Sequence, residues 1–183
     1  MTATTTRTAR QLALIGEVVA ITADVRIQVW LRGGWAMDFF LGEVTREHDD
    51  IDFFAWALDG PALAAELPRH GFRPVPGPPP AKQLDFTRHG EDLQFALLAR
   101  DATGRPADAG GPWAGEPFPE AAPDPEPGRL GELTCPVVNP AGQIEIKRMM
   151  PQWNPRLRRR PKDAADIARL RAALARSGDP GSQ

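Results

Sequence analysis

The sequence has 183 residues, 42% of them hydrophobic and 25% charged, with a formal net charge of -2. This length suits one domain, or one domain with a small appended lobe, and it can bury a sizeable core. The charge balance excludes a strongly basic nucleic-acid coat. The single cysteine, Cys135, cannot form an internal disulfide, no apolar run approaches membrane-spanning length, and residues 1–10 lack the apolar segment of a signal peptide. We therefore expect a cytoplasmic protein.

The amino-terminal end is predicted to be disordered over residues 1–7, which are mostly small and polar. Over residues 8–23, apolar side chains such as Leu12, Ile15 and Val18 recur at helical spacing. This pattern predicts an amphipathic helix that packs against a sheet.

Residues 27–31 form a β-rich apolar run that is followed closely by Gly33 and Gly34. Paired glycines permit positive φ and a close approach of the backbone to a ligand. Residues 35–41 are predicted to form a short helix after them, so unpaired N–H groups and the positive end of the helix dipole face the same place. The turn is therefore a candidate phosphate-binding site.

Asp50 and Asp52 stand at the entrance of a strand predicted over residues 51–56. Residues two apart on a strand project from one face, roughly 6.5 to 7 Å apart. Two neighbouring carboxylates repel each other and suit a hard divalent ion, most naturally Mg²⁺ carrying nucleotide phosphates. Together with the glycine turn, they supply neutralised phosphates and a fixed α-phosphorus, which nucleotidyl transfer needs.

Each of these parts has a simpler explanation when it is taken alone. Paired glycines between a strand and a helix are usually only a tight turn, and an acidic run usually lies on a solvated loop. His48 alone would be a hydrogen-bonded structural residue and Arg46 a surface charge. Asp38, on the short helix, is expected to be a structural or capping carboxylate. The joint pattern at this spacing favours the nucleotide and metal site.

The rest of the chain predicts further helices and strands around this site. We expect a helix from Asp59, its cap, through Arg69; a strand at 72–75; a hairpin of 82–88 and 92–100 around His89 and Gly90; a last strand at 133–138; a helix over 139–150, capped by Asn139; and a helix over 162–176. The domain prediction is a core over 8–138, a helical segment over 139–176 and a disordered tail over 177–183. Within the core, the Pro- and Gly-rich residues 101–131 are expected to be a surface loop.

A longer pattern surrounds the glycine turn and the aspartate pair. It comprises Gly33, Gly34, Trp35, Ala36, Met37 and Asp38, then Leu41, Gly42, Val44, Thr45, Arg46, His48, Asp49, Asp50, Ile51 and Asp52. This pattern resembles the motif of the aminoglycoside 2''-adenylyltransferase and lincosamide nucleotidyltransferase group, within the DNA polymerase β-like nucleotidyltransferases. Arg160, Pro161, Lys162, Asp163, Asp166 and Ile167 also resemble a segment that opens the C-terminal helix in many small nucleotidyltransferases.

The resemblance implies an α/β (α+β) fold with a small mixed β-sheet flanked by helices. It implies transfer of AMP from Mg²⁺-ATP to a hydroxyl of a small molecule, such as an aminoglycoside or lincosamide antibiotic, with no membrane or nucleic-acid partner. Gly33 and Gly34 would hold the triphosphate, and Asp50 and Asp52 would bind Mg²⁺. Further candidates for nucleotide binding are Arg46, His48, Lys147 and Lys162.

The family also places a third carboxylate on a later strand, as a metal ligand or general base, and the matching position here is Gln94. An amide cannot take a proton from a hydroxyl. Asp92 shares the strand face of Gln94 by parity and is the expected catalytic substitute, with Asp85 as the alternative. If neither substitutes, the protein is a degenerate nucleotide-binding or regulatory member.

Two surface segments have open interpretations. The resemblance to aminoglycoside-modifying enzymes suggests that Trp113 and Phe118, among acidic residues, form the wall of an acceptor pocket that favours a cation, although a plain surface loop also explains the composition. The basic run at 151–161 is either a solvated face or a clamp for phosphates, since guanidinium groups bind phosphate oxygens bidentately. A protein or RNA acceptor is a third hypothesis, which rests on this run alone.

Overall fold

The computed structural model describes residues 6–110, 114–118, 126–153 and 161–177, with the backbone alone for 150–153 and 177. Its elements in chain order are α1 (Thr6–Asp24), β1 (Val29–Leu31), α2 (Gly33–Leu41), β2 (Ile51–Trp56), a 3₁₀ turn (Ala57–Asp59), α3 (Gly60–Arg69), β3 (Arg73–Val75), β4 (Gln83–Arg88), β5 (Glu91–Arg100), β6 (Pro106–Asp108), β7 (Gly128–Leu130), β8 (Leu133–Cys135), α4 (Pro140–Trp153) and α5 (Pro161–Ser177). The predicted mixed α/β fold is confirmed. Within the described residues, no helix is both long and apolar enough to cross a bilayer.

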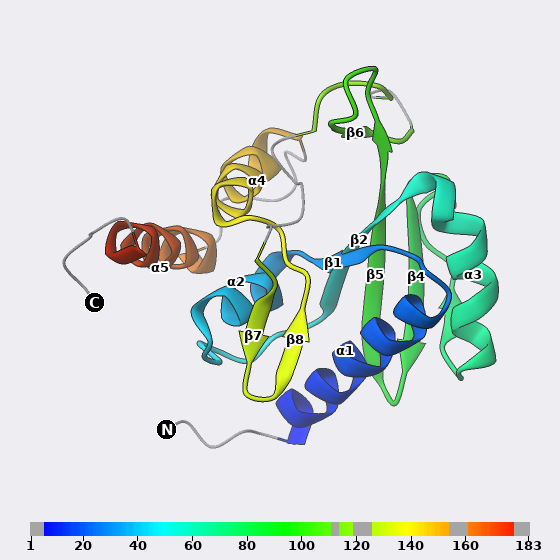
Figure 1. Ribbon diagram of the computed structural model, residues 1–183, viewed down its shortest axis with the longest axis horizontal. Helices are drawn as coiled ribbons and strands as arrows, with labels where there is room; N and C mark the ends of the chain where they lie inside the picture. Colours follow the sequence, from blue (N-terminus) through cyan, green and yellow to red (C-terminus); the bar gives the residue numbers. More distant parts are fainter. Residues whose placement is uncertain (1–5, 111–113, 119–125, 154–160, 178–183) are drawn as a thin grey trace.

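The main sheet has the strand order β1-β2-β5-β4-β3, and β6 pairs with the far end of β5. Strands β2 and β5 are parallel, while the other neighbours are antiparallel. In Figure 1, α3 lies to the right of these strands, and α2, α4 and α5 lie to the left. The short β7–β8 pair forms a second sheet beside α2.

The two faces of the main sheet differ in character because side chains alternate along a strand. On one face, Ile51, Phe53 and Phe95 are fully buried in the main core, which also includes apolar side chains of α1 and α3. The rings of Phe53 and Phe95 stack with their centroids 5.1 Å apart. The other face is apolar at one end, where Phe54 joins a second cluster, and polar at the end where β2 begins. The polar end holds the predicted site.

Several predicted boundaries differ from the structure at the chain ends. Helix α1 begins at Thr6, so Thr6 and Arg7 are helical although we expected disorder through residue 7. The reason is that Arg7 is anchored by hydrogen bonds to the core of the domain. The cap of α4 is confirmed, because Gly142 N donates to Asn139 Oδ1 at 2.7 Å, but this helix continues beyond residue 150 to Trp153. In contrast, Asp59 makes no side-chain capping bond to α3.

The region between β5 and α4 is more ordered than its composition predicts. Strands β6 and β7 both fall within residues 101–131, where we expected only a loop. The predicted strand at 133–138 divides into two parts. Its first part, β8, pairs with β7. Residues 136–138 instead run beside β1, where Leu31 N donates to the Pro136 carbonyl and Val138 N donates to the Leu31 carbonyl, both at 2.8 Å. Phe118 packs edge-on against Phe54, with centroids 5.5 Å apart, so it belongs to the second apolar cluster. Trp113 and the basic residues at 154–160 lie outside the described residues.

Candidate nucleotide and metal site

The glycine turn, Gly33 and Gly34, lies directly against β2, the strand that carries Asp52. Gly33 begins α2 with a φ of 71°, a conformation that side chains disfavour. A Cβ at this position would lie 2.9 Å from Asp52 Oδ2, too close for an ordinary contact. The backbone N–H of Arg32 also donates to the Asp52 carbonyl at 2.9 Å. The helix thus begins at the glycines themselves, two residues earlier than predicted, and the structure brings Gly33 and Asp52 together.

Gly34 is required for a different reason, which is the packing of His48 and Arg46 beneath it. A Cβ on Gly34 would overlap the His48 ring and lie 2.9 Å from Arg46 Nη2. His48 is buried, with its Nδ1 2.8 Å from Arg46 Nη1 and its Nε2 2.7 Å from Asp38 Oδ2. Arginine only donates, so Nδ1 accepts and the Nε2 proton is donated to Asp38. Both ring nitrogens of His48 are therefore engaged inside the protein.

Asp38 holds the loop between α2 and β2 by hydrogen bonds to Thr45. It is fully buried, and its Oδ1 accepts a hydrogen bond of 2.6 Å from the hydroxyl of Thr45. The Thr45 N–H donates to the other oxygen at 3.2 Å. These contacts agree with the structural part that the sequence suggests for Asp38.

Asp50 and Asp52 form the candidate metal pair. Asp52 is half-buried on the polar face, and its Oδ1 lies 3.1 Å from Arg32 Nη2. Burial, followed by the charge of Asp52, raises the pKa of Asp50 above its usual value, while Lys162 and Arg32 act in the opposite direction. A raised pKa means that the available cations do not fully balance the pair. Arg32 was missed in the sequence, although a basic residue directly before two glycines is a usable signal.

The residues present fit a magnesium ion that arrives with a nucleotide. Among the described residues, no three His, Cys, Asp or Glu side chains group in a way that could hold a metal by themselves. Mg²⁺ commonly uses only one or two carboxylates and takes its other ligands from phosphates and water. Asp50 and Asp52 could supply those two carboxylates beside the glycine turn.

Two of the predicted basic residues, Lys162 on α5 and Lys147 on α4, differ in their partners. Lys162 Nζ lies 3.5 Å from Asp49 Oδ2, and its charge also acts on Asp50. Lys147, on α4, instead pairs with Asp166 of α5 at 2.9 Å. Lys162 is thus near the acidic pair, whereas the ammonium of Lys147 is already engaged by a carboxylate.

Asp166 joins α5 to the rest of the site. Its carboxylate is 1% exposed and lies 3.2 Å from Arg46 Nη2, besides the contact with Lys147 and one with Arg169 at 3.7 Å. Burial alone would raise its pKa, but the charges and hydrogen bonds of Lys147 and Arg46 outweigh this and lower the pKa. In the sequence, Asp166 was visible only as part of a motif, and its link to Arg46 was not anticipated.

Four polar residues surround the position of the third carboxylate. Asp52 pairs with Gln94 across β2 and β5, and Gln94 pairs with Asp85 across β5 and β4, so these three share one face. Gln83 Nε2 donates to Asp85 Oδ1 at 2.7 Å. Asp92 is exposed on the same face, one step nearer the start of β5. Because Ile51 pairs with Leu93 in parallel register, Asp92 is the counterpart of Asp50.

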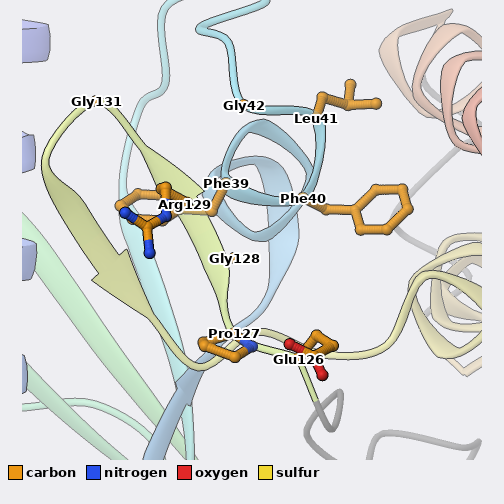
Figure 2. Close-up of a pocket in the computed structure, with 9 residues that line it drawn as sticks. All are labelled: Phe39, Phe40, Leu41, Gly42, Glu126, Pro127, Gly128, Arg129 and Gly131. Carbon is orange, nitrogen blue, oxygen red and sulfur yellow. The ribbon is translucent and has the colours of Figure 1, made fainter. Parts of the chain in front are cut away.

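A cavity that the sequence did not predict lies at the other end of α2. Figure 2 shows it beside the last residues of the helix, with Phe40 and Leu41 directed away from β7. Its volume is about 490 Å³. It is lined by Phe39, Phe40, Leu41, Gly42, Glu126, Pro127, Gly128, Arg129 and Gly131. None of the predicted site residues lines it, so it is separate from the glycine turn.

Comparison with solved structures agrees with this fold. A crystal structure of ANT(2'')-Ia in complex with adenylyl-2''-tobramycin superimposes with a TM-score of 0.73, covering 92% of this chain and 91% of the other at 19% identity. A lincomycin-bound structure of the lincosamide antibiotic adenylyltransferase LnuA gives a TM-score of 0.65, with 85% and 93% coverage at 18% identity. At these identities the likeness establishes the fold alone.

Sequence comparison identifies the family. Proteins named 2''-aminoglycoside nucleotidyltransferase, from Klebsiella pneumoniae and Escherichia coli, are 48% identical over 42 residues, which is 23% of this chain and 24% of theirs. The match thus spans about a quarter of the length of these curated relatives. The profile of the aminoglycoside-2''-adenylyltransferase family, in contrast, matches residues 14–155, most of the chain. The chain therefore belongs to the aminoglycoside-2''-adenylyltransferase family.

Proposed function

We propose that this protein is a cytoplasmic nucleotidyltransferase that transfers AMP from Mg²⁺-ATP to a hydroxyl group of a small antibiotic. The observation that carries the proposal is the contact between Gly33 and Asp52, beside the incompletely balanced charge of Asp50. This arrangement sets a phosphate-binding turn against a carboxylate pair that suits a divalent ion. The family membership supports the same reaction class.

The residues divide into those that would touch the nucleotide and those that hold the turn. Gly33 and Gly34 would receive the triphosphate on their backbone, and Asp50 and Asp52 would hold Mg²⁺, which would neutralise phosphate charge when bound. Lys162 would approach the phosphates, since its ammonium already lies beside the acidic loop. The other basic candidates would act through the turn and through α5, because each already hydrogen-bonds to protein side chains: Arg46 to His48, His48 to Asp38, and Lys147 to Asp166.

The reaction would form one bond and break one bond at the α-phosphorus. The oxygen of the acceptor hydroxyl would attack this phosphorus, and the bond to the oxygen that bridges to the β-phosphate would break, releasing pyrophosphate. The hydroxyl proton would pass to the Asp92 carboxylate, which is exposed on the site face as the counterpart of Asp50. A general base in this position contributes by removing the proton as the new bond forms.

The polar face supports a cationic, hydroxylated acceptor. Asp85 and Asp92 line the part of the sheet beyond the metal pair, with Gln83 and Gln94 between them. Carboxylates attract amines, and amides can bond hydroxyls. The solved neighbour that holds an adenylylated tobramycin has such an acceptor, which supports an aminoglycoside over a lincosamide here.

The second candidate is a degenerate member that binds the nucleotide without turnover, and Gln94 is the observation that favours it. Measuring pyrophosphate release from each of the four common NTPs, with Mg²⁺ and a panel of aminoglycosides and lincosamides, separates the two. We expect release with ATP and an aminoglycoside together, and a product heavier by one AMP. Thermal stabilisation by Mg²⁺-ATP without release would indicate the degenerate binder. Neither stabilisation nor release would contradict both.

A further inference from the structure

A buried carboxylate, Glu91, lies on the opposite side of the sheet from the proposed site. It begins β5, and its side chain is only 2% exposed. Three side chains of α1 donate to it: Arg7 Nε at 3.1 Å, Arg10 Nη1 at 2.8 Å and Gln11 Nε2 at 2.9 Å. Burial alone would raise the pKa of Glu91, but these hydrogen bonds outweigh it and lower the pKa. The group is thus a buried anion with matched donors.

Two of these donors also bind the main chain directly before the metal pair. Arg7 Nη2 donates to the Asp49 carbonyl at 2.6 Å, and Gln11 Nε2 lies 3.3 Å from the His48 carbonyl. Gln11 in turn accepts a hydrogen bond of 3.0 Å from the indole of Trp35, in the first turn of α2. The network therefore joins α1, the glycine-turn helix, the loop before Asp50 and the first residue of β5.

We infer that Glu91 is a positioning residue for Asp50: by orienting Arg7 and Gln11, it fixes the backbone from which the metal-binding carboxylate projects. This inference rests on the proposed function. Neutralising Glu91 would leave two guanidinium groups without their common anion, and the carbonyls of His48 and Asp49 would lose oriented donors. A shift of about 1 Å in a reacting group can cost about 100-fold in rate.

The hydrogen bonds of Glu91 also bear on the direction of its neighbour Asp92, on the opposite face of β5. Glu91 and Asp92 are neighbours with opposite faces, so anchoring the first side chain in the core sets the direction of the second toward the site. The position of the proposed base and the position of Asp50 thus depend on one buried anion. Partners behind metal ligands typically change metal affinity or activity by about 10- to 100-fold when they are removed.

The test measures Mn²⁺ affinity by electron paramagnetic resonance in the presence of a non-hydrolysable ATP analogue. Glu91→Gln keeps the shape of the side chain but removes its charge. Arg7→Ala removes the bond to the Asp49 carbonyl and leaves Arg10 and Gln11 to pair with Glu91. The matched control is Glu17→Gln, which breaks another ion pair of α1, the one with Arg88 at 2.7 Å.

We expect Mn²⁺ affinity to fall about tenfold in Glu91→Gln and Arg7→Ala, with wild-type affinity in Glu17→Gln. Melting temperatures are recorded separately, because a purely structural role would lower them without changing the affinity of the folded fraction. If Glu91→Gln does not fold, Arg7→Ala decides. Wild-type affinity in the folded variants overturns this inference alone, whereas a wild-type protein that binds no Mn²⁺-nucleotide overturns the proposed function with it.

Discussion

Two carboxylates near the glycine turn have pKa values that are shifted in opposite directions. Asp166, on the α5 side, has three cationic side chains within 4 Å, and its pKa is lowered despite burial. Asp50, on the β2 side, has its pKa raised by burial and by Asp52. The chain is therefore able to balance a buried acid fully, and at Asp50 it does not. The proposed Mg²⁺ would supply the missing positive charge at Asp50.

The largest effect should follow from removing charge at the incompletely balanced carboxylate. Asp50→Asn is expected to lower nucleotidyl transfer by about 10³-fold, because a metal-assisted charge stabilisation of several kcal/mol is lost and each tenfold corresponds to about 1.4 kcal/mol. Without metal and nucleotide, the free energy of unfolding should stay unchanged or rise by about a few tenths of a kcal/mol, since one partner of a repelling pair is gone. Transfer rates and denaturant unfolding measure the two quantities.

The control for this variant is Asp24→Asn, which removes an exposed carboxylate at the end of α1. It should change neither rate nor stability. Saturating Mg²⁺-nucleotide should stabilise the wild type and the control by about 2.7 kcal/mol at a hundredfold excess over the dissociation constant, but not Asp50→Asn. Retained Mg²⁺-dependent nucleotide binding in Asp50→Asn would contradict the proposal that Asp50 holds the metal ion.

A smaller effect is expected at the third carboxylate position, where Asp92 and Asp85 flank Gln94. Asp92→Asn should lower the rate by about 10²-fold, as is usual for loss of a general base. Asp85→Asn is the comparison variant on the same face: Asp85 is held by Gln83, and with the acceptor at saturation the rate of this variant should stay within about threefold of the wild type. Steady-state rates with ATP and an acceptor give both numbers.

Gln94→Asp sharpens this test because it adds the carboxylate that the family resemblance implies. If Asp92 is the base, Gln94→Asp should restore much of the rate lost in Asp92→Asn. A large loss in Asp85→Asn with a normal Asp92→Asn would instead assign the base to β4. Wild-type rates in both single variants would mean that neither carboxylate is the base. An absence of turnover in the wild type itself would favour the degenerate interpretation.

Local pattern was sufficient to predict much of this molecule. An apolar, aromatic run located β2, and the hairpin around His89 and Gly90 located β4 and β5. The spacing of Asp50 and Asp52 placed both near the end of one strand. The family motif gave the fold, which the structure and comparisons confirm. These features depend on neighbours in the sequence, so a sequence alone reveals them.

The partners of charged residues could not be predicted in the same way. The contacts of Arg46, a candidate for nucleotide binding, with His48 and, 120 residues later, with Asp166 were not anticipated. The hydrogen bonds of Glu91 were not predicted either, because their donors lie 80 to 84 residues earlier, on α1. Likewise, β6 and β7 form inside a Pro- and Gly-rich region because other segments pair with them. Long-range pairing decides these cases, and local composition does not record it.

The smallest effect in this series concerns the balanced carboxylate and appears in stability. Asp166→Asn should lower the free energy of unfolding by about 2 kcal/mol, below the 3–5 kcal/mol typical of breaking a fully buried pair, because the Arg46 side chain stays 25% exposed and that of Lys147 11%. Denaturant unfolding measures it. The control is Asp163→Asn, three residues earlier on α5 and only half-buried, which should stay within about 0.5 kcal/mol of the wild type.

The pH dependence of that loss tests its electrostatic origin. The folded pKa of Asp166 lies below its ordinary value of 3.8, so ionised Asp166 stabilises the protein above that value, and the contribution disappears as the pH falls through the lower folded pKa. The difference between wild type and Asp166→Asn should therefore be constant near neutral pH and shrink below about pH 4. A difference that persists unchanged at lower pH would mean that Asp166 contributes by packing, and the contrast with Asp50 would no longer concern charge.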